Sequence, residues 1–139
     1  GSLKSEVESF ISENHLESKI EFIGKIPNIE LPAELGASDV YISTSLSDGT
    51  SLSLLEAMAC GLGIIVSDVT AIREWISDDN GIVVESRNVT QITAALEKYY
   101  SSRELIIVHG NKNIEIAKQR ADWNKNYEKL KEIYEKIRK

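Results

Sequence analysis

Residues 47–68 read SDGTSLSLLEAMACGLGIIVSD, and this stretch decides the fold class. A polar loop runs into an apolar segment with helical spacing, which ends at the glycine-rich residues 61–63. The β-branched run at 64–66 follows at once, and such a continuous run is typical of a strand that is covered on both faces. The stretch therefore predicts a helix that leads into a buried parallel strand.

The same alternation extends to both sides of this stretch. The predicted strands are residues 20–23, 40–43, 63–66 and 81–84, and the helices between them are residues 3–14, 31–37, 53–59 and 71–76. Strands and helices that alternate in this way indicate an α/β fold, with a Rossmann-like parallel sheet and flanking helices. Four strands are few for such a sheet. We therefore expect the chain to lack the first strand or strands of its domain.

The last third of the sequence is helical in pattern. Asn88 with Gln91 forms a candidate capping box, Ser101 with Glu104 marks a second helix start, and Asp122 is the expected cap of a third. The last helix carries a stripe of apolar residues that we expect to face the core, with docking on a partner domain as the alternative; the stripe is Trp123, Tyr127, Leu130, Tyr134 and Ile137. The expected organisation is a cloning scar at 1–2, a truncated Rossmann-like domain at 3–121, and a helix at 122–139 that packs on it.

Composition excludes several classes of protein. The chain has 139 residues, 42% of them hydrophobic and 27% charged, which is sufficient for one domain with a core. The net charge of −6 argues against a nucleic-acid partner, which requires a basic surface. A single cysteine, Cys60, allows no internal disulfide and fits a cytoplasmic protein, although the parent protein could contact a membrane through its missing half.

Two carboxylates, Asp48 and Glu56, flank the start of the helix at 53–59. The loop before this helix follows the strand at 40–43, and ligands of open α/β sheets bind at the carboxyl ends of strands. The free amides at residues 50–53 can bind a phosphate anion. Carboxylates are poor phosphate ligands but good acceptors for sugar hydroxyls. The pattern therefore suits a nucleotide sugar, while a solvated Glu56 on an amphipathic helix is the alternative.

Residues 47–68 resemble the donor-site motif of the GT4-type glycosyltransferases (glycosyl transferases group 1), which are retaining enzymes of the GT-B architecture. The family pattern is Glu-Gly-Phe-Gly, four further residues, and then Glu-Ala-Met-Ala-x-Gly-x-Pro-Val-Val, and Asp48 and Glu56 keep the spacing of its acidic positions. The matching segments outside the motif are EFIGKIP at 21–27, ASDVYIST at 37–44, IREWI at 72–76 and NGIVV at 80–84. The resemblance implies the C-terminal, donor-binding half of a GT-B fold.

The resemblance also implies roles for single residues. Glu56 is expected to hold the donor ribose, and Asp48 to contact hydroxyls of the transferred hexose. The other positions that it places around the donor are Gly49, Thr50 and Ser51 at the sugar, Leu52 and Ser53 at the phosphates, and Gly24, Lys25 and Ile26 at the base. An ordinary turn at a strand end explains residues 24–26 equally well.

Departures from the family pattern affect the expected pocket. Asp48 replaces the usual Glu and shortens the arm by one methylene, and Thr50-Ser51 replaces an aromatic-glycine pair with a more polar one. The family's basic residues at the diphosphate come from a loop that would precede Leu3. We therefore expect no catalytic residue in this fragment and no transfer by the fragment alone.

The resulting expectation is the donor-binding domain of a hexosyltransferase that uses a nucleotide-diphosphate sugar with retention. No Asp-x-Asp pair is present in the sequence, so the expected transfer needs no metal and no cofactor. The expected partners are the nucleotide sugar, a missing N-terminal acceptor domain and, through an exposed sheet edge, a second copy of the chain. The alternatives are a nucleotide-sugar epimerase domain and a noncatalytic interaction fragment; the donor base and hexose stay open.

Overall fold

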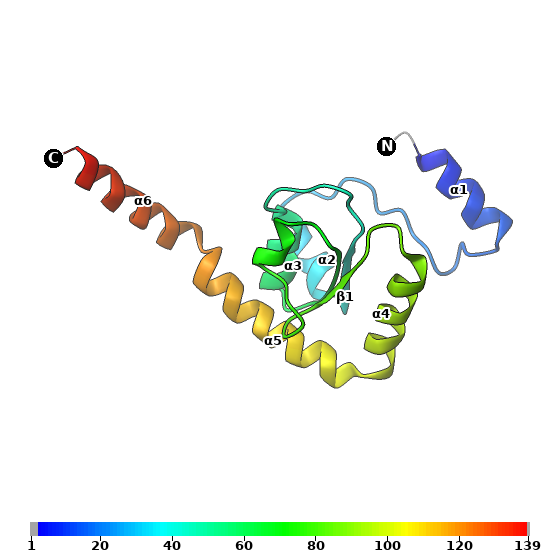
Figure 1. Ribbon diagram of the computed structural model, residues 1–139. Coiled ribbons are helices and arrows are strands. Elements are labelled where there is room, and N and C mark those ends of the chain that lie inside the picture. Colours follow the sequence, from blue (N-terminus) through cyan, green and yellow to red (C-terminus); the bar gives the residue numbers. More distant parts are fainter. Residues whose placement is uncertain (1–2, 139) are drawn as a thin grey trace. The chain divides into compact units, whose positions relative to one another are not determined.

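The computed structural model describes residues 3–138. The chain divides into two compact units, unit 1 with Gly1–Glu30 and unit 2 with Leu31–Lys139. In unit 1, helix α1 (Lys4–Glu13) buries Ile11, and Asn14 closes the helix by donating from its side-chain Nδ2 to the Phe10 carbonyl oxygen at 2.8 Å. Figure 1 traces the helices and strands in chain order.

The strand predicted at residues 20–23 is not formed. Residues 20–23 have no regular secondary structure, and Ile20, Phe22 and Ile23 are exposed. A strand forms only when its N–H and C=O groups pair with a neighbouring strand. The described part of unit 1 contains no second strand that could supply this pairing. The apolar pattern favours a strand here, but a local preference alone does not form one.

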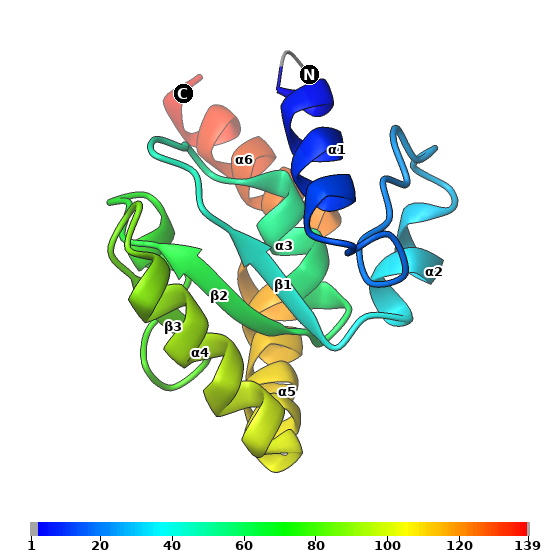
Figure 2. The same cartoon turned by 90° about the vertical axis from the view of Figure 1, so that its right-hand side faces the viewer.

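Unit 2 is built around a parallel sheet with the strand order β1-β2-β3. The strands are β1 (Val40–Ser43), β2 (Gly63–Ser67) and β3 (Ile82–Val84), and the helices are α2 (Leu31–Gly36), α3 (Leu52–Ala59), α4 (Val89–Ser101), α5 (Arg103–Arg120) and α6 (Trp123–Ile137). Helices α3 and α4 pack on opposite faces of the sheet (Figure 2). The predicted Rossmann-like parallel sheet with flanking helices is confirmed.

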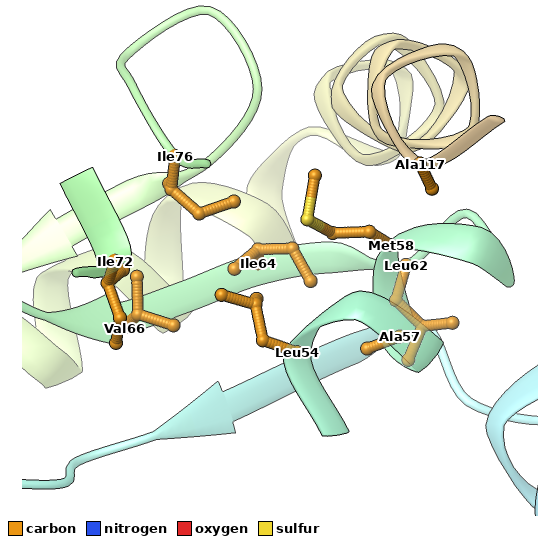
Figure 3. Packing of buried hydrophobic residues seen from close by; sticks show 9 residues of the cluster. All are labelled: Leu54, Ala57, Met58, Leu62, Ile64, Val66, Ile72, Ile76 and Ala117. Carbon is orange, nitrogen blue, oxygen red and sulfur yellow. The ribbon is translucent and has the colours of Figure 1, made fainter. Parts of the chain in front are cut away.

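The central strand β2 is buried along its whole length, as its β-branched run predicts. Its alternate side chains enter two apolar clusters on the two faces of the sheet. Ile64 packs with Leu54 and Met58 of α3 (Figure 3), and Ile65 packs with Tyr99 of α4. Each such side chain contributes about 1.5–3 kcal/mol when it is fully buried. The two clusters therefore fix α3 and α4 against the sheet.

Helix α3 ends in a tight turn that leads directly into β2. Gly61 adopts φ +78°, a left-handed conformation that glycine adopts without steric cost. The Gly61 N–H donates to the Met58 carbonyl oxygen at 3.1 Å, and the Leu62 N–H donates to the Ala57 carbonyl oxygen at 3.2 Å. These two bonds form a Schellman motif, which satisfies carbonyl groups at the end of a helix.

Helix α5 crosses this turn at very short range. A Cβ atom on Gly110 would overlap the carbonyl group of Gly61, so only a glycine fits at position 110. Buried amides hold the crossing: Asn113 Nδ2 donates to the Leu62 carbonyl oxygen at 3.0 Å, and Asn80 Nδ2 donates to Asn113 Oδ1 at 2.8 Å. Both asparagines are buried, and such satisfied polar groups specify one packing arrangement.

Several predicted helix ends are confirmed and others are corrected. Asn88 Oδ1 accepts from the Gln91 N–H at 3.1 Å, but Gln91 Oε1 accepts from the Glu85 N–H at 2.7 Å, so the capping box is only half formed. Helix α5 begins one residue later than predicted, with Ser102 as its cap. Asp122 caps α6 as predicted, and the Lys125 N–H bond to its carboxylate lowers the pKa of Asp122.

The helix predicted at residues 71–76 is a single 3-10 turn at Ile72–Glu74. Asp68 does not cap this turn, because its carboxylate accepts from Arg73 Nε at 2.7 Å and from Arg73 Nη2 at 2.8 Å. This bidentate hydrogen bond holds the pKa of Asp68 below its ordinary value. Arg73 and Asp68 therefore form an ion pair across this turn.

The apolar stripe of α6 is exposed and does not face the core of unit 2. No residue of this helix is buried, and Trp123, Tyr134 and Ile137 are 78%, 67% and 76% exposed. The expectation of a core-facing stripe is therefore wrong, because helical periodicity shows that a face is apolar but not what covers it. Among residues 3–138, no helix is both long and apolar enough to cross a bilayer.

The glycine at the α5 crossing provides a test of this packing. We predict that Gly110→Ala lowers the free energy of unfolding by about 2 kcal/mol. The collision of the added methyl group with rigid backbone costs about 3 kcal/mol, and the helix preference of alanine offsets about 1 kcal/mol of it. Urea unfolding followed by circular dichroism measures the change. Gly36→Ala, at a position with open space, is the control, and equal stabilities of the two variants would contradict the crossing.

His109 provides a second test, through pH. Burial lowers the pKa of this imidazole below its ordinary 6.5, and its Nδ1 lies 2.8 Å from the Tyr99 hydroxyl oxygen. Because the unfolded chain binds this proton more readily, His109 contributes stability above pH 6.5 that is lost as the pH falls through its folded pKa. Urea unfolding between about pH 8 and pH 5 should show this loss, and His109→Gln should reduce it. An NMR titration that places the His109 pKa in the folded protein at or above 6.5 would refute the prediction.

Candidate functional site

The first turn of α3 lies beyond the carboxyl end of β1 and presents free backbone donors. Ser51 caps the helix: its Oγ accepts from the Leu54 N–H at 3.4 Å, and its carbonyl oxygen accepts from the Leu55 N–H at 3.1 Å. Among residues 3–138, no acceptor contacts the N–H groups of Leu52 and Ser53. Unsatisfied amides at a helix start attract anions, which the helix dipole also favours. This turn can therefore hold a phosphate group.

Glu56 lies one helical turn after Leu52, on the face of α3 that points away from the sheet. The opposite face carries Leu54, Ala57 and Met58, all of which are buried, so the predicted orientation of Glu56 is confirmed. Its carboxylate is exposed, and no hydrogen bond or ion pair within residues 3–138 engages it. Side chains four residues apart share a helix face and lean toward the helix start. The carboxylate of Glu56 can therefore reach a ligand bound at the first turn.

The loop between β1 and α3 contributes the second carboxylate. Asp48 is half-buried, and its carboxylate has no donor among the described residues. Gly49 and Thr50 are exposed, and no atom lies within 4 Å of the position that a Cβ on Gly49 would occupy. A half-buried carboxylate without a partner is available to accept hydroxyl donors from a ligand. The structure thus places residues 48–53 and Glu56 around one helix start.

An apolar groove of about 450 Å³ runs along the Glu56 face of α3, between α3 and α5. Leu52, Leu55 and Ile114 form part of its walls, and Glu56 and Lys118 are polar residues of its lining. The sequence pattern does not predict this groove. It exists because α5 crosses the end of α3 at Gly110, and the sequence signal for that crossing was a glycine within an otherwise helical pattern.

The residues predicted to contact the base, Gly24, Lys25 and Ile26, lie in unit 1. Gly24 adopts φ +78°, which explains a glycine at this turn, while Lys25 is exposed and Ile26 is half-buried. Gly24 and Lys25 line a hollow of about 470 Å³ next to Phe22, and Lys4 Nζ lies 5.9 Å from the centre of the Phe22 ring. Unit 1 therefore offers a small basic and aromatic hollow at the predicted turn.

A chain of hydroxyl groups at the first turn of α3 was also missed from the sequence. Tyr41 of β1 places its hydroxyl oxygen 2.8 Å from Ser53 Oγ, and Ser53 Oγ lies 3.1 Å from Ser51 Oγ. Its signal was a tyrosine in an apolar strand, since a buried or half-buried phenol usually finds a polar partner. No group of three or more His, Cys, Asp or Glu side chains suited to a metal ion occurs among residues 3–138.

Comparisons with known proteins agree with this geometry. The family model for glycosyl transferases group 1 matches residues 1–106. An uncharacterized glycosyltransferase of Methanocaldococcus jannaschii is 31% identical over 126 residues, which cover 89% of this chain and 32% of that protein. The O-antigen chain mannosyltransferase B of Escherichia coli is 33% identical over 78 residues, 56% of this chain and 20% of that protein. The chain thus spans a third or less of these two relatives.

Solved structures show the same fold. The C-terminal domain of a glycosyl transferase group 1 family protein (LpcC) from Francisella tularensis superposes with a TM-score of 0.80 at 28% identity, and the match covers 88% of this chain and 64% of that one. Anabaena HepE in complex with UDP superposes with a TM-score of 0.88 at 19% identity, and the match covers 95% of this chain and 36% of that one. The second likeness concerns the fold alone.

Proposed function

Because the chain belongs to the glycosyl transferases group 1 family, we propose that it binds the nucleotide-sugar donor of a glycosyltransferase. The transferred group is a hexose, which leaves a nucleoside diphosphate and joins an acceptor with retention of configuration. One observation carries the proposal: amides and two carboxylates without partners among residues 3–138 lie in the loop before α3 and in its first two turns. A sugar nucleotide matches this set of groups, because it combines an anionic diphosphate with hydroxyl groups on both sides of it.

Each part of the donor has a matching group at this site. The amides of Leu52 and Ser53 bind the diphosphate, because they are free donors at the positive end of a helix. Glu56 accepts hydrogen bonds from the ribose hydroxyls, and Asp48, next to the open position at Gly49, accepts them from the hexose. Charge-assisted bonds of this kind contribute about 1.5–3 kcal/mol each. Thr50 and Ser51 complete the sugar side of the pocket.

Relatives support both the transferred group and the leaving group of this proposal. The Escherichia coli relative is named a mannosyltransferase, which favours a hexose as the transferred group. The Anabaena protein with the same fold was solved with UDP, which favours a nucleoside diphosphate as the leaving group. We propose that the transfer uses no metal and no cofactor, and that cationic side chains outside residues 3–138 neutralise the diphosphate.

A partner domain follows from the same proposal. Relatives are about three times as long as this chain, so an acceptor-binding domain has room in the rest of such a protein. The exposed stripe on α6 supports this domain as a partner, since an amphipathic helix whose apolar side is uncovered is a surface suited to docking. We propose that the stripe packs against the acceptor domain.

Donor binding can be tested by NMR titration with UDP-, GDP- and ADP-sugars. We predict that at least one series shifts the amide signals of residues 48–56, because these groups surround the bound diphosphate and sugars. Glu56→Gln should weaken binding of that nucleotide about tenfold or more, the loss expected for charge-assisted hydrogen bonds. Removing the ribose hydroxyls from the nucleotide should then cost wild type more affinity than it costs Glu56→Gln.

Glu97→Gln is the matched control for this titration. Glu97 is an exposed carboxylate on α4, which packs on the sheet face opposite to α3. The charge change is therefore the same, but it lies away from the proposed site. If none of the three series of nucleotide sugars shifts the amide signals of residues 48–56, donor binding is rejected and a noncatalytic interaction fragment is favoured. Equal losses in Glu56→Gln and Glu97→Gln would reject the role of Glu56.

We predict that the chain alone transfers no sugar. Transfer requires groups that stabilise the charge of the departing diphosphate. Residues 48–56 offer no cationic side chain, and a single lysine, Lys118, lines the groove beside Glu56. Release of free sugar from the nucleotide sugars, measured by chromatography, should proceed at the rate observed in buffer. Release well above that rate would show that the chain contains catalytic groups of its own.

A further inference from the structure

The hydroxyl chain Tyr41–Ser53–Ser51 connects β1 to the proposed diphosphate site. The two oxygen–oxygen distances are 2.8 Å from Tyr41 to Ser53 and 3.1 Å from Ser53 to Ser51. Ser51 Oγ also accepts from the Leu54 N–H at 3.4 Å, so one of its lone pairs is already used. The chain therefore has a fixed end at the helix backbone and a second end on the strand.

The arrangement of these hydroxyl groups can leave the proton of Ser53 free to donate. A hydroxyl group has one proton to donate and two lone pairs to accept with. When Tyr41 and Ser51 both donate to Ser53 Oγ, both lone pairs of that oxygen are occupied and its own proton has no partner within the chain. An anion next to Ser53 favours this direction, because linked hydrogen bonds polarise one another toward a negative charge.

We propose that Tyr41 is a positioning residue for the diphosphate. Its hydroxyl group donates to Ser53 Oγ and thereby directs the Ser53 proton to a phosphate oxygen, next to the free amides of Leu52 and Ser53. The inference rests on the proposed function and adds to it a residue of β1 that does not touch the donor itself. The ring of Tyr41 packs against the α3 core cluster, so the strand holds the hydroxyl group in place.

The test separates this role from simple packing. Tyr41→Phe keeps the ring and removes its hydroxyl group. Ser53→Ala removes the hydroxyl group proposed to donate to the phosphate, and the double variant removes both hydroxyl groups. The probes are the nucleoside diphosphate that wild type binds and the corresponding nucleoside, titrated by NMR. Tyr41→Phe should weaken binding of the nucleoside diphosphate about three- to tenfold, as expected for the loss of one neutral hydrogen bond. The affinity for the nucleoside should not change.

The double variant gives the decisive comparison. If Tyr41 acts only through Ser53, Tyr41→Phe has no further effect once Ser53 is alanine, so the two losses do not multiply. Tyr100→Phe is the control, because Tyr100 is 91% exposed and lies on α4. It should bind both probes as wild type does.

Three results would overturn the proposal: unchanged diphosphate affinity in Tyr41→Phe, an equal loss for the nucleoside, or losses that multiply in the double variant. Each of these leaves donor binding itself intact, because wild type still binds the diphosphate. If wild type binds no nucleotide at all, donor binding fails and the positioning role fails with it. The two failures are therefore distinguishable in one set of titrations.

Discussion

The contact between Gly61 and Gly110 is the constraint on which the rest of unit 2 depends. Helix α5 crosses the turn between α3 and β2 so closely that no side chain fits at position 110. The crossing brings Asn113 to the Leu62 carbonyl oxygen and places α5 alongside α3. The groove beside Glu56 is a direct consequence, because its two walls are these two helices. A site residue on α3 is thus oriented by packing at the far end of the same helix.

Most of the fold of unit 2 could be predicted from local pattern. The buried run in β2 and the caps Asn88 and Asp122 lie where the sequence places them, because each depends on neighbours a few residues away. The predictions that failed concern segments that need another segment to pair with or to cover them. Residues 20–23 have the composition of a strand, but the described part of unit 1 offers no strand to pair with. The α6 stripe has the period of a core face, but no described residue of unit 2 buries it. Periodicity reports what a segment can bury, not whether it finds a partner.

The residues that form the candidate site could be predicted from the sequence, but the residues that support it could not. Residues 48–56 are continuous in sequence, so the loop, the helix start and the orientation of Glu56 follow from helical spacing and a familiar motif. Tyr41 and Lys118 reach the same region from β1 and α5, and only the packing of those elements on α3 reveals them. A local signal, such as a tyrosine in an apolar strand, does not identify the distant segment that the side chain contacts. The residues that support a site are therefore harder to predict than those that form it.

The central claim is that one helix start binds a diphosphate while Glu56 binds the attached ribose. A crystal structure of the chain with the nucleoside diphosphate bound tests this most directly. The account predicts phosphate oxygens within hydrogen-bond distance of the Leu52 and Ser53 amides, and a ribose hydroxyl about 2.6–3.2 Å from the Glu56 carboxylate. A nucleotide bound elsewhere, or one with its ribose turned away from Glu56, would contradict it.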